Sequence, residues 1–353
     1  MSRAREIADL GSPAESGLSN RNFVINGGMQ IWQRTTSATA ANNDYVTVDR
    51  FGFGELTDGA YTSEQSTDTP TGTGFSIKAQ VTTADTSIAA AQFAYIYQDI
   101  EAQNLQSLQY GTSSAKTITL SFSVKSNKTG TYTIGIVKPD STAYYIPIEY
   151  TINSANTWER KTITISPTAG STSLITASGG AIANDNGQGF QVAFGLAWGS
   201  NFHGTNNTWS ASTHYGTSNQ VNWMDSTANN FYLTQVQLEI GEVATPFEHE
   251  DIKTTLAKCQ RYFQIHDDMH FRGYATGTNQ RIEQYFALGT TMRADPARAV
   301  ITAGSSSNVR SAATTYSGLT LGARTGGAIL SIEAAAAGLA YIEDRKESLD
   351  AEL

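Results

Sequence analysis

The sequence predicts a mainly β fold: an antiparallel, jelly-roll-like β-sandwich with a short N-terminal helix and a smaller C-terminal β-module. Three observations predict it. Apolar and hydroxyl side chains alternate strictly over residues 117–124, which is the period of a half-buried strand. Similar short segments recur, separated by turns rich in Gly, Asn and Ser, as in sandwiches and jelly rolls. Charged residues make up only 16% of the chain, against about a quarter in typical globular proteins.

The first part of the chain, residues 1–20, is expected to be an attachment segment. Residues 2–10 form a short helix with Ile7 and Leu10 on one side, and the turn-rich residues 11–20 form a linker. Two helical turns are too short to be stable alone in water. We therefore expect this helix to bind a partner, either its own symmetry mates or another protein.

The body of the chain, residues 21–250, is expected to form the sandwich. The strand at 117–124 is followed by a turn and a second alternating segment at 131–137, as in a hairpin. Four more strands are predicted at 144–152, 158–165, 191–198 and 232–240.

A connecting helix is predicted over residues 251–264. Asp251 is a suitable N-cap, and an apolar stripe follows it. The stripe consists of Ile252, Leu256, Cys259 and Phe263. Residues 265–353 return to short strands, such as 282–288 and 328–334. We expect them to form a smaller β-module that serves as a tip or as a trimer contact.

Composition argues against several classes of protein. The net charge is −9 and no basic stripe occurs, whereas a nucleic-acid binder needs clustered Lys and Arg. No segment approaches the roughly 18 apolar residues of a membrane span. Residues 1–10 lack the apolar core of a signal peptide. The single cysteine, Cys259, excludes an intrachain disulfide and is expected to be a buried small hydrophobe.

No catalytic or metal-binding motif emerges, so we expect a protein that is not an enzyme and needs no cofactor. Nucleophile elbows, phosphate loops and zincin helices are all missing from the sequence. The acidic residues are scattered, with no recognisable acid–base pair. His266 and His270 are four residues apart, but the sequence shows no evident third ligand, so no metal site is predicted.

The best candidate for a binding surface is the long polar segment 198–225, which carries aromatic residues at intervals. Saccharides present an apolar C–H face and a rim of hydroxyls, which a flat ring beside amide and hydroxyl groups can match. Long loops on a sandwich scaffold often carry function. We expect Trp198 and Trp223 to pack against the fold. The candidate glycan-binding residues are Trp209, Tyr215, Phe202 and His214.

Two segments far apart in the chain resemble a known family. The first is Asn22-Phe-Val-Ile-Asn-Gly-Gly-Met-Gln-Ile-Trp-Gln-Arg34, followed by Asp49-Arg-Phe51. The second is Gln237-Leu-Glu-Ile-Gly-Glu-Val-Ala-Thr-Pro-Phe-Glu248, followed by Cys259-Gln-Arg-Tyr-Phe263. Together they resemble the opening and closing segments of the carbohydrate-binding-module-like sandwich in bacteriophage tail-fibre and receptor-binding proteins.

The resemblance implies a virion protein of the phage tail, made in the host cytoplasm and released by lysis. It implies a homotrimer that is attached through residues 1–20 to another virion protein, such as a tail adaptor or nozzle. The sandwich would adhere to host cell-surface polysaccharide. An alternative stays open: a head fibre or capsid decoration protein with the same sandwich.

Most of the motif residues are expected to serve folding. Asn26-Gly27-Gly28 would give the backbone freedom to bend, and Trp32 is expected in the core. Arg34 and Asp49-Arg50 would either form an internal ion pair or cap a strand end. Gln235, Gln237 and Glu239 alternate with apolar residues and are expected on an exposed face.

Overall fold

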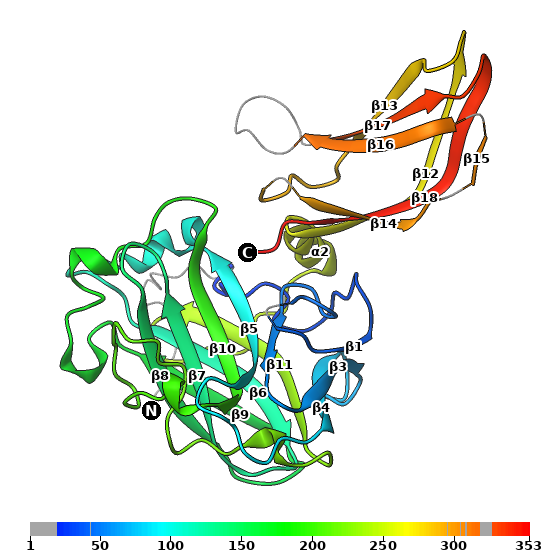
Figure 1. The fold of residues 1–353 in the computed structure, drawn as a ribbon. Helices are drawn as coiled ribbons and strands as arrows, with labels where there is room; N and C mark the ends of the chain where they lie inside the picture. The colour runs from blue at the N-terminus through cyan, green and yellow to red at the C-terminus, as the bar shows by residue number, and fades with distance from the viewer. Residues whose placement is uncertain (1–19, 43, 295, 304, 308, 318–326) are drawn as a thin grey trace, which may run out of the picture. The chain divides into compact units, whose positions relative to one another are not determined.

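A computed structural model describes residues 20–42, 44–294, 296–303, 305–307, 309–317 and 327–353 (Figure 1). The expected helix and linker at residues 1–20 therefore lie, apart from Asn20, outside the described residues. The chain divides into two compact units: the first ends at Glu250 and the second begins at Asp251. No helix among the described residues is long and apolar enough to cross a membrane.

The first unit is an antiparallel β-sandwich, as the sequence predicts. One sheet has six strands in the order β1-β3-β4-β11-β6-β9, and the other has five in the order β2-β5-β10-β7-β8. The six strands are β1 (Ser37–Thr39), β3 (Ala60–Ser66), β4 (Ser76–Thr83), β11 (Asn230–Ile240), β6 (Ile118–Ser126) and β9 (Glu159–Ile165). The five are β2 (Gly52–Leu56), β5 (Phe93–Glu101), β10 (Gln188–Trp198), β7 (Gly130–Lys138) and β8 (Tyr144–Ile152).

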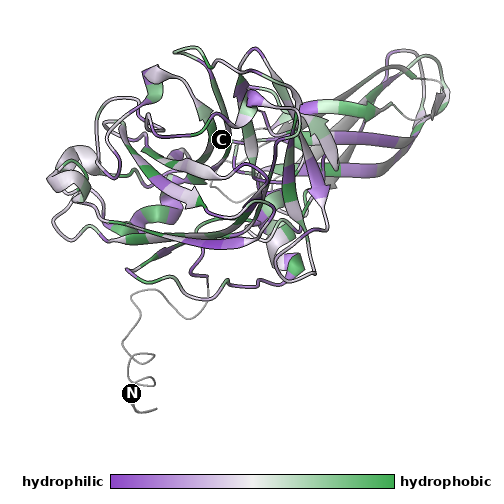
Figure 2. Cartoon of the chain, turned by 90° about the horizontal axis from the view of Figure 1, so that it is seen from below, coloured by the Kyte–Doolittle hydropathy of each residue, from purple (hydrophilic) through white to green (hydrophobic). Residues whose placement is uncertain are grey.

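The core lies between these two sheets and is built by alternate residues of each strand. On β10, for example, Phe190, Val192 and Phe194 are fully buried and belong to one large hydrophobic cluster with residues of both sheets. Figure 2 shows hydrophobic and hydrophilic residues alternating along the strands of the sandwich. Burial of this apolar surface is the main term that stabilises the sandwich.

Strand β6 departs from the expected half-buried pattern, because its hydroxyl face is buried as well. Thr119, Ser121 and Ser123 are at most 3% exposed. The hydroxyl of Thr119 donates to the carbonyl of Gly241 at 2.7 Å, and that of Ser123 to the Gln235 side chain at 2.8 Å. Buried hydroxyls need such partners. The strand is therefore buried on both faces, and its polar face is satisfied by neighbouring segments.

The two motif segments lie side by side and hold each other through hydrogen bonds. The Glu248 carboxylate accepts the backbone N–H groups of Asn20, Arg21 and Asn22 at 2.7–3.2 Å. The Asn22 side chain in turn donates to the carbonyl of Val236 at 2.9 Å and accepts from the Leu238 N–H at 3.0 Å. The motif residues thus close the sandwich by joining its two ends.

Gln237 and Glu239 are 0% and 1% exposed, so their expected place on an exposed face is wrong. The Glu239 carboxylate accepts hydrogen bonds from Gln237 Nε2, from the Thr245 N–H and from the Thr245 hydroxyl, each at 2.8 Å. The segment that follows β11 folds back over these side chains. The alternation of polar and apolar residues within β11 does not predict that a later segment covers its polar face.

The glycine pair of the first motif also serves a different purpose from the one expected. The left-handed residue there is Asn26 (φ 58°), whose carboxamide oxygen accepts the N–H groups of Gln30 and Ile31. A Cβ on Gly27 would lie 2.0 Å from the carbonyl oxygen of Val236. Gly27 is thus required by the close approach of β11. Trp32 is only partly buried, at the edge of the core.

Arg34 and Arg50 take separate roles. Arg34 Nη1 lies 3.9 Å from the Asp49 carboxylate, so an internal ion pair forms. The Arg50 guanidinium is fully buried and donates to the backbone carbonyl of Asp99 at 2.6 Å.

The second unit begins with helix α2 (Ile252–Gln260), which is shorter than the predicted span 251–264. The Asp251 side chain caps it by accepting the N–H groups of Lys253 and Thr254, as predicted. Cys259 is fully buried, which confirms that expectation, but Ile252 is 58% exposed, so the stripe is not buried throughout. Phe263 already belongs to the next strand.

Two small antiparallel sheets complete the second unit. One has the order β12-β18-β14, with β15 also pairing with β18, and the other has the order β13-β17-β16. Their strands are β12 (Phe263–Ala275), β18 (Gly338–Asp350), β14 (Ala297–Thr302), β15 (Ser305–Ser307), β13 (Arg281–Ala287), β17 (Gly327–Ala334) and β16 (Val309–Ser317). His266 and His270 lie on β12, in a strand and not in the helix that a pair four residues apart would need.

Candidate functional site

Aromatic rings cover the outer face of the five-stranded sheet. Tyr95 and Tyr97 alternate with the core residues of β5, and Trp198 ends β10. The rings of Tyr95 and Trp198 are stacked with centroids 4.8 Å apart, and offset stacks of this kind add to the energy of burial. We call the set the aromatic layer; it comprises Tyr45, Phe93, Tyr95, Tyr97, Trp198, Phe202 and Tyr215.

Glycines on β2 make room for this layer. Gly52 pairs with Tyr97 and Gly54 with Tyr95 across the β2–β5 ladder. A Cβ on Gly52 would lie 2.3 Å from the Tyr97 ring, and one on Gly54 would lie 2.1 Å from the Tyr95 ring. The Gly-Phe-Gly sequence of β2 thus places Phe53 in the core and two bare backbone positions under the tyrosines.

The segment from residue 199 to residue 222, here called the capping loop, folds over this sheet. Its middle pairs with the free edge of β8, where Tyr145 and Ser210 exchange backbone hydrogen bonds at 2.8 and 2.9 Å. It then returns across the sheet, so that a Cβ on Gly135 would lie 2.9 Å from the Tyr215 ring. Tyr215 stacks on Trp198 with centroids 4.9 Å apart.

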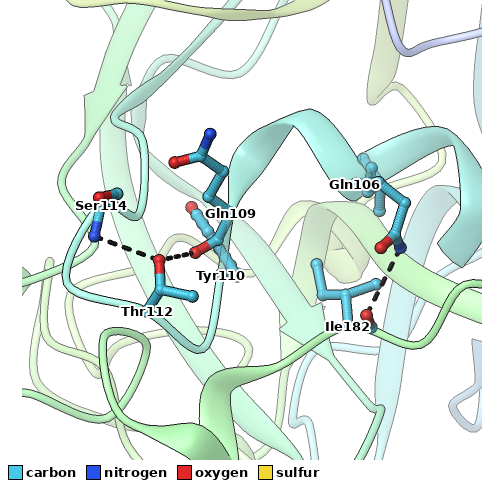
Figure 3. Close-up of a pocket in the computed structure, with 7 residues that line it drawn as sticks. Gln106, Gln109, Tyr110, Thr112, Ser114 and Ile182 are labelled. Carbon is cyan, nitrogen blue, oxygen red and sulfur yellow. Dashed lines mark hydrogen bonds between the residues drawn. The ribbon is translucent and has the colours of Figure 1, made fainter.

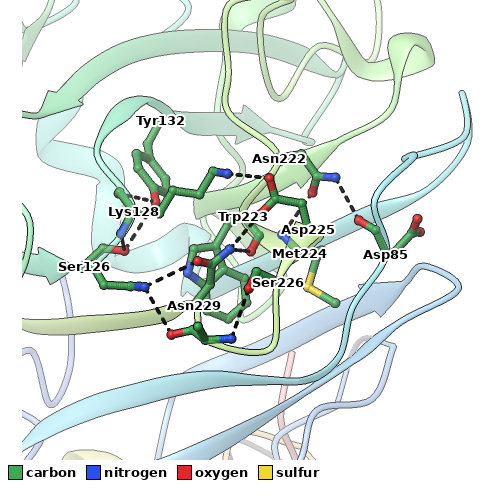
Figure 4. A network of polar contacts seen from close by, with 12 residues as sticks. Asp85, Ser126, Lys128, Tyr132, Asn222, Trp223, Met224, Asp225, Ser226 and Asn229 are labelled. Atoms are coloured by element: carbon green, nitrogen blue, oxygen red, sulfur yellow. Dashed lines mark hydrogen bonds and ion pairs between the residues drawn. The ribbon is translucent and has the colours of Figure 1, made fainter.

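A polar network fixes the end of the capping loop (Figure 4). The Asn222 side chain donates to the carbonyl of Asp85 at 2.8 Å and accepts the N–H of Met224. Just beyond the loop, Lys128 pairs with Asp225 at 2.5 Å. Trp223 is fully buried here, as expected. The loop is therefore held at its middle and at its end.

Trp209, the first of the four candidate residues, lies in the core. It is 1% exposed, and its indole N–H donates to the carbonyl of Ser166 at 3.0 Å. The neighbouring residues in the sequence are polar and give no sign that Trp209 is buried. It is buried because the capping loop turns this one aromatic residue inward where it pairs with β8. Trp209 therefore anchors the loop and is not part of an exposed surface.

The other three candidates are half-buried residues of the capping loop. Phe202 and Tyr215 lie together, with ring centroids 6.2 Å apart and planes at 71°. The His214 ring lies against the backbone of Gly204, where a Cβ would be 2.5 Å away. Each keeps part of its side chain in contact with solvent.

Tyr145 is a surface aromatic residue that the sequence reasoning missed. It is half-buried, and its ring centroid lies 5.5 Å from that of Tyr215, with the planes at 66°. The pair Tyr144-Tyr145 could have predicted an outward-facing tyrosine, because neighbouring residues of a strand point to opposite faces. Tyr144 faces the core, so Tyr145 faces outward.

Polar groups lie beside these exposed rings. The Glu149 carboxylate accepts a hydrogen bond from the Thr217 hydroxyl at 2.6 Å and one from the Asn219 amide at 3.0 Å. Glu149 and Tyr145 point to the same side of β8, which is the outer face. Rings, an amide and a carboxylate thus lie on one face of the sheet, whereas Thr217 itself is buried.

A buried carboxylate lies farther along the same face. Asp99 accepts hydrogen bonds from the side-chain amides of Gln188 at 2.5 Å and Gln191 at 3.0 Å. Burial raises the pKa of Asp99 to about 6, although the two amides and the Arg50 charge oppose the rise. Gln188 and Gln191 are themselves half-buried, so they link Asp99 to the surface.

Side chains of these kinds can contact a sugar. Exposed rings can stack on the C–H face of a pyranose, and the neighbouring amides and carboxylate can exchange hydrogen bonds with its hydroxyls. Tyr215 is stacked on the buried Trp198 ring, so little of its side-chain entropy is lost on binding. Within the described residues, no three His, Cys, Asp or Glu side chains come together as a metal site.

Comparisons with known proteins find related folds. No family model and no curated protein matches the sequence. Among solved structures, the family 11 carbohydrate-binding module from Clostridium thermocellum matches at 11% identity and a TM-score of 0.29, over 59% of this chain and 98% of that one. The cellulose-binding domain of Cellulomonas fimi β-1,4-glucanase C matches at 14% and 0.27, over 56% and 90%.

A third match is the enzymatically active domain of tailspike protein 4 of bacteriophage CBA120, at 11% identity and a TM-score of 0.31, over 63% of this chain and 22% of that one.

Proposed function

We propose that this protein is a phage tail-fibre or receptor-binding protein whose sandwich adheres to glycans on the host surface. Adhesion would take place on the outer face of the five-stranded sheet, where the capping loop and β8 present their side chains. The protein would act by non-covalent binding, without catalysis.

The observation that carries the glycan-binding proposal is the group of half-exposed rings Tyr145, Phe202 and Tyr215. Tyr215 is stacked on the buried Trp198 ring, so it keeps a fixed orientation. Glu149 and Asn219 supply hydrogen-bonding groups beside the rings, and the buried Thr217 hydroxyl donates to the Glu149 carboxylate. Rigid rings with a few fixed polar groups are the usual composition of a small-ligand site.

The virion location rests on the two motif segments that resemble tail-fibre proteins. In this structure Asn22 and Glu248 join the two segments through hydrogen bonds, which supports treating them as parts of one structural feature. A homotrimer attached to a virion partner through residues 1–20 would present three copies of the site. Weak sites gain apparent affinity when several bind at once.

Immunogold electron microscopy of intact phage particles, with antibody against residues 264–353, tests the location. Label at the tail supports a fibre or receptor-binding protein. Label spread over the capsid contradicts the tail location and favours the alternative of a head fibre or decoration protein. Adsorption of the isolated protein to host cells, with surface polysaccharide as competitor, tests adhesion separately; a lack of competition contradicts glycan binding.

A further inference from the structure

A concave site lies apart from the aromatic layer, beside the 3-10 helix η1 (Ala102–Leu108) that follows β5. It is a cavity of about 450 Å³. Leu105 and Tyr110 line it and are nearly buried, at 1% and 6% exposure. The remaining residues that line it are Gln106, Gln109, Thr112, Ser114 and Ile182 (Figure 3).

Several polar groups in this cavity have capacity for a ligand. The Tyr110 hydroxyl is buried and has no hydrogen-bond partner among the described residues. Within the same part of the chain, neither the Gln109 carboxamide nor the Ser114 hydroxyl makes a side-chain hydrogen bond. An unpaired buried hydroxyl costs free energy. A ligand hydroxyl that reached Tyr110 would remove this cost.

The wall opposite these groups is held in place before any ligand binds. Gln106 Nε2 donates to the carbonyl of Ala183 at 2.7 Å and contacts that of Ile182 at 3.4 Å. The fully buried Lys138 ammonium donates to the carbonyls of Gly179 at 2.8 Å and Ala181 at 3.2 Å. Two side chains thus fix the backbone around Ile182, which lowers the entropy that binding must overcome.

The chemistry of the lining selects the class of ligand. No charged side chain lines the cavity, so an anionic or cationic sugar would lose hydration without gaining an ion pair. Leu105, Tyr110 and Ile182 supply apolar contact area, while amides and hydroxyls surround it. We propose that this cavity binds a single neutral hexose residue, independently of the aromatic layer. For a ligand of this size we expect a Kd on the order of millimolar.

Saturation-transfer NMR on the full chain tests the proposal, with D-glucose, D-galactose, D-mannose and N-acetyl-D-glucosamine as separate probes. At least one sugar should receive saturation. Tyr110→Phe removes only the hydroxyl, and Gln109→Gly removes the amide where φ is 55°, a conformation that suits glycine. Each should weaken binding about two- to tenfold, the value of one hydrogen bond.

One control variant locates the binding. Asn104→Ala changes an exposed residue of η1 outside the cavity and should bind the sugar as the unmodified protein does. A cavity that holds only water would give no saturation transfer to any of the four sugars, and that result overturns the proposal. Binding that neither Tyr110→Phe nor Gln109→Gly weakens overturns it as well.

Discussion

Gly54 illustrates how one missing side chain decides the position of a ring. Its hydrogen atoms lie under Tyr95, and any Cβ there would be 2.1 Å from that ring. Tyr95 in turn stacks on Trp198. The glycine therefore sets the height of the aromatic layer above the sheet.

Gly54→Ala is expected to destabilise the sandwich by about 1–3 kcal/mol, the usual cost of overpacking. The measurement is the free energy of unfolding from urea denaturation. Gly28→Ala is a matched control, because its Cβ would make an ordinary contact of 3.5 Å with Phe247. Equal effects of the two substitutions would show that the Tyr95 ring moves aside freely.

Asp99 makes stability depend on pH. Its pKa is about 6 in the folded chain against 3.8 for the ordinary group, because burial disfavours the carboxylate. The folded state therefore binds more protons than the unfolded state between these values. This contribution to stability is complete below pH 4 and is lost as the pH rises through 6.

Asp99→Asn should remove that dependence. In the unmodified protein, the fall in the free energy of unfolding between pH 4 and pH 7 should be larger than in the variant, by up to about 3 kcal/mol. Chemical denaturation of both proteins at the two pH values measures this difference. The same fall in both would contradict the role given to Asp99.

At the scale of elements, the sandwich is closed by side chains of the two motif segments. Glu239→Ala leaves the Gln237 amide and the Thr245 N–H and hydroxyl without their acceptor. Loss of buried partners of this kind costs about 1–3 kcal/mol, and thermal or urea unfolding would measure it. Glu242→Ala, at an exposed position nearby, should change stability by less than about 0.5 kcal/mol. A variant at Glu239 as stable as that at Glu242 would refute the closure role.

The strands were predictable from the sequence because core-facing apolar residues recur at every second position along them. The predicted strand at 144–152 matches β8 residue for residue, and 191–198 lies within β10. Burial of the second face of β6 was not predictable, since it depends on a segment more than a hundred residues away. Trp209 was misplaced for the same reason: its burial follows from pairing between the capping loop and β8.

At the scale of the whole molecule, the proposed assembly makes a prediction about mass. A homotrimer of this chain would sediment as three times 37.9 kDa, and sedimentation equilibrium measures this directly. Three copies would carry three glycan-binding surfaces on one fibre, which compensates for weak single sites. A mass near that of one chain at micromolar concentration would contradict the trimer.

Adhesion through the half-exposed rings is the central claim, and a glycan array printed with bacterial surface polysaccharides tests it most directly. The unmodified protein and the double variant Tyr145→Ala/Tyr215→Ala would be compared, with Trp158→Ala, at the residue before β9 of the six-stranded sheet, as control. We predict that the unmodified protein and the control bind the same glycan and that the double variant loses at least about tenfold in binding. No binding to any glycan, or equal binding by the double variant, would contradict the claim.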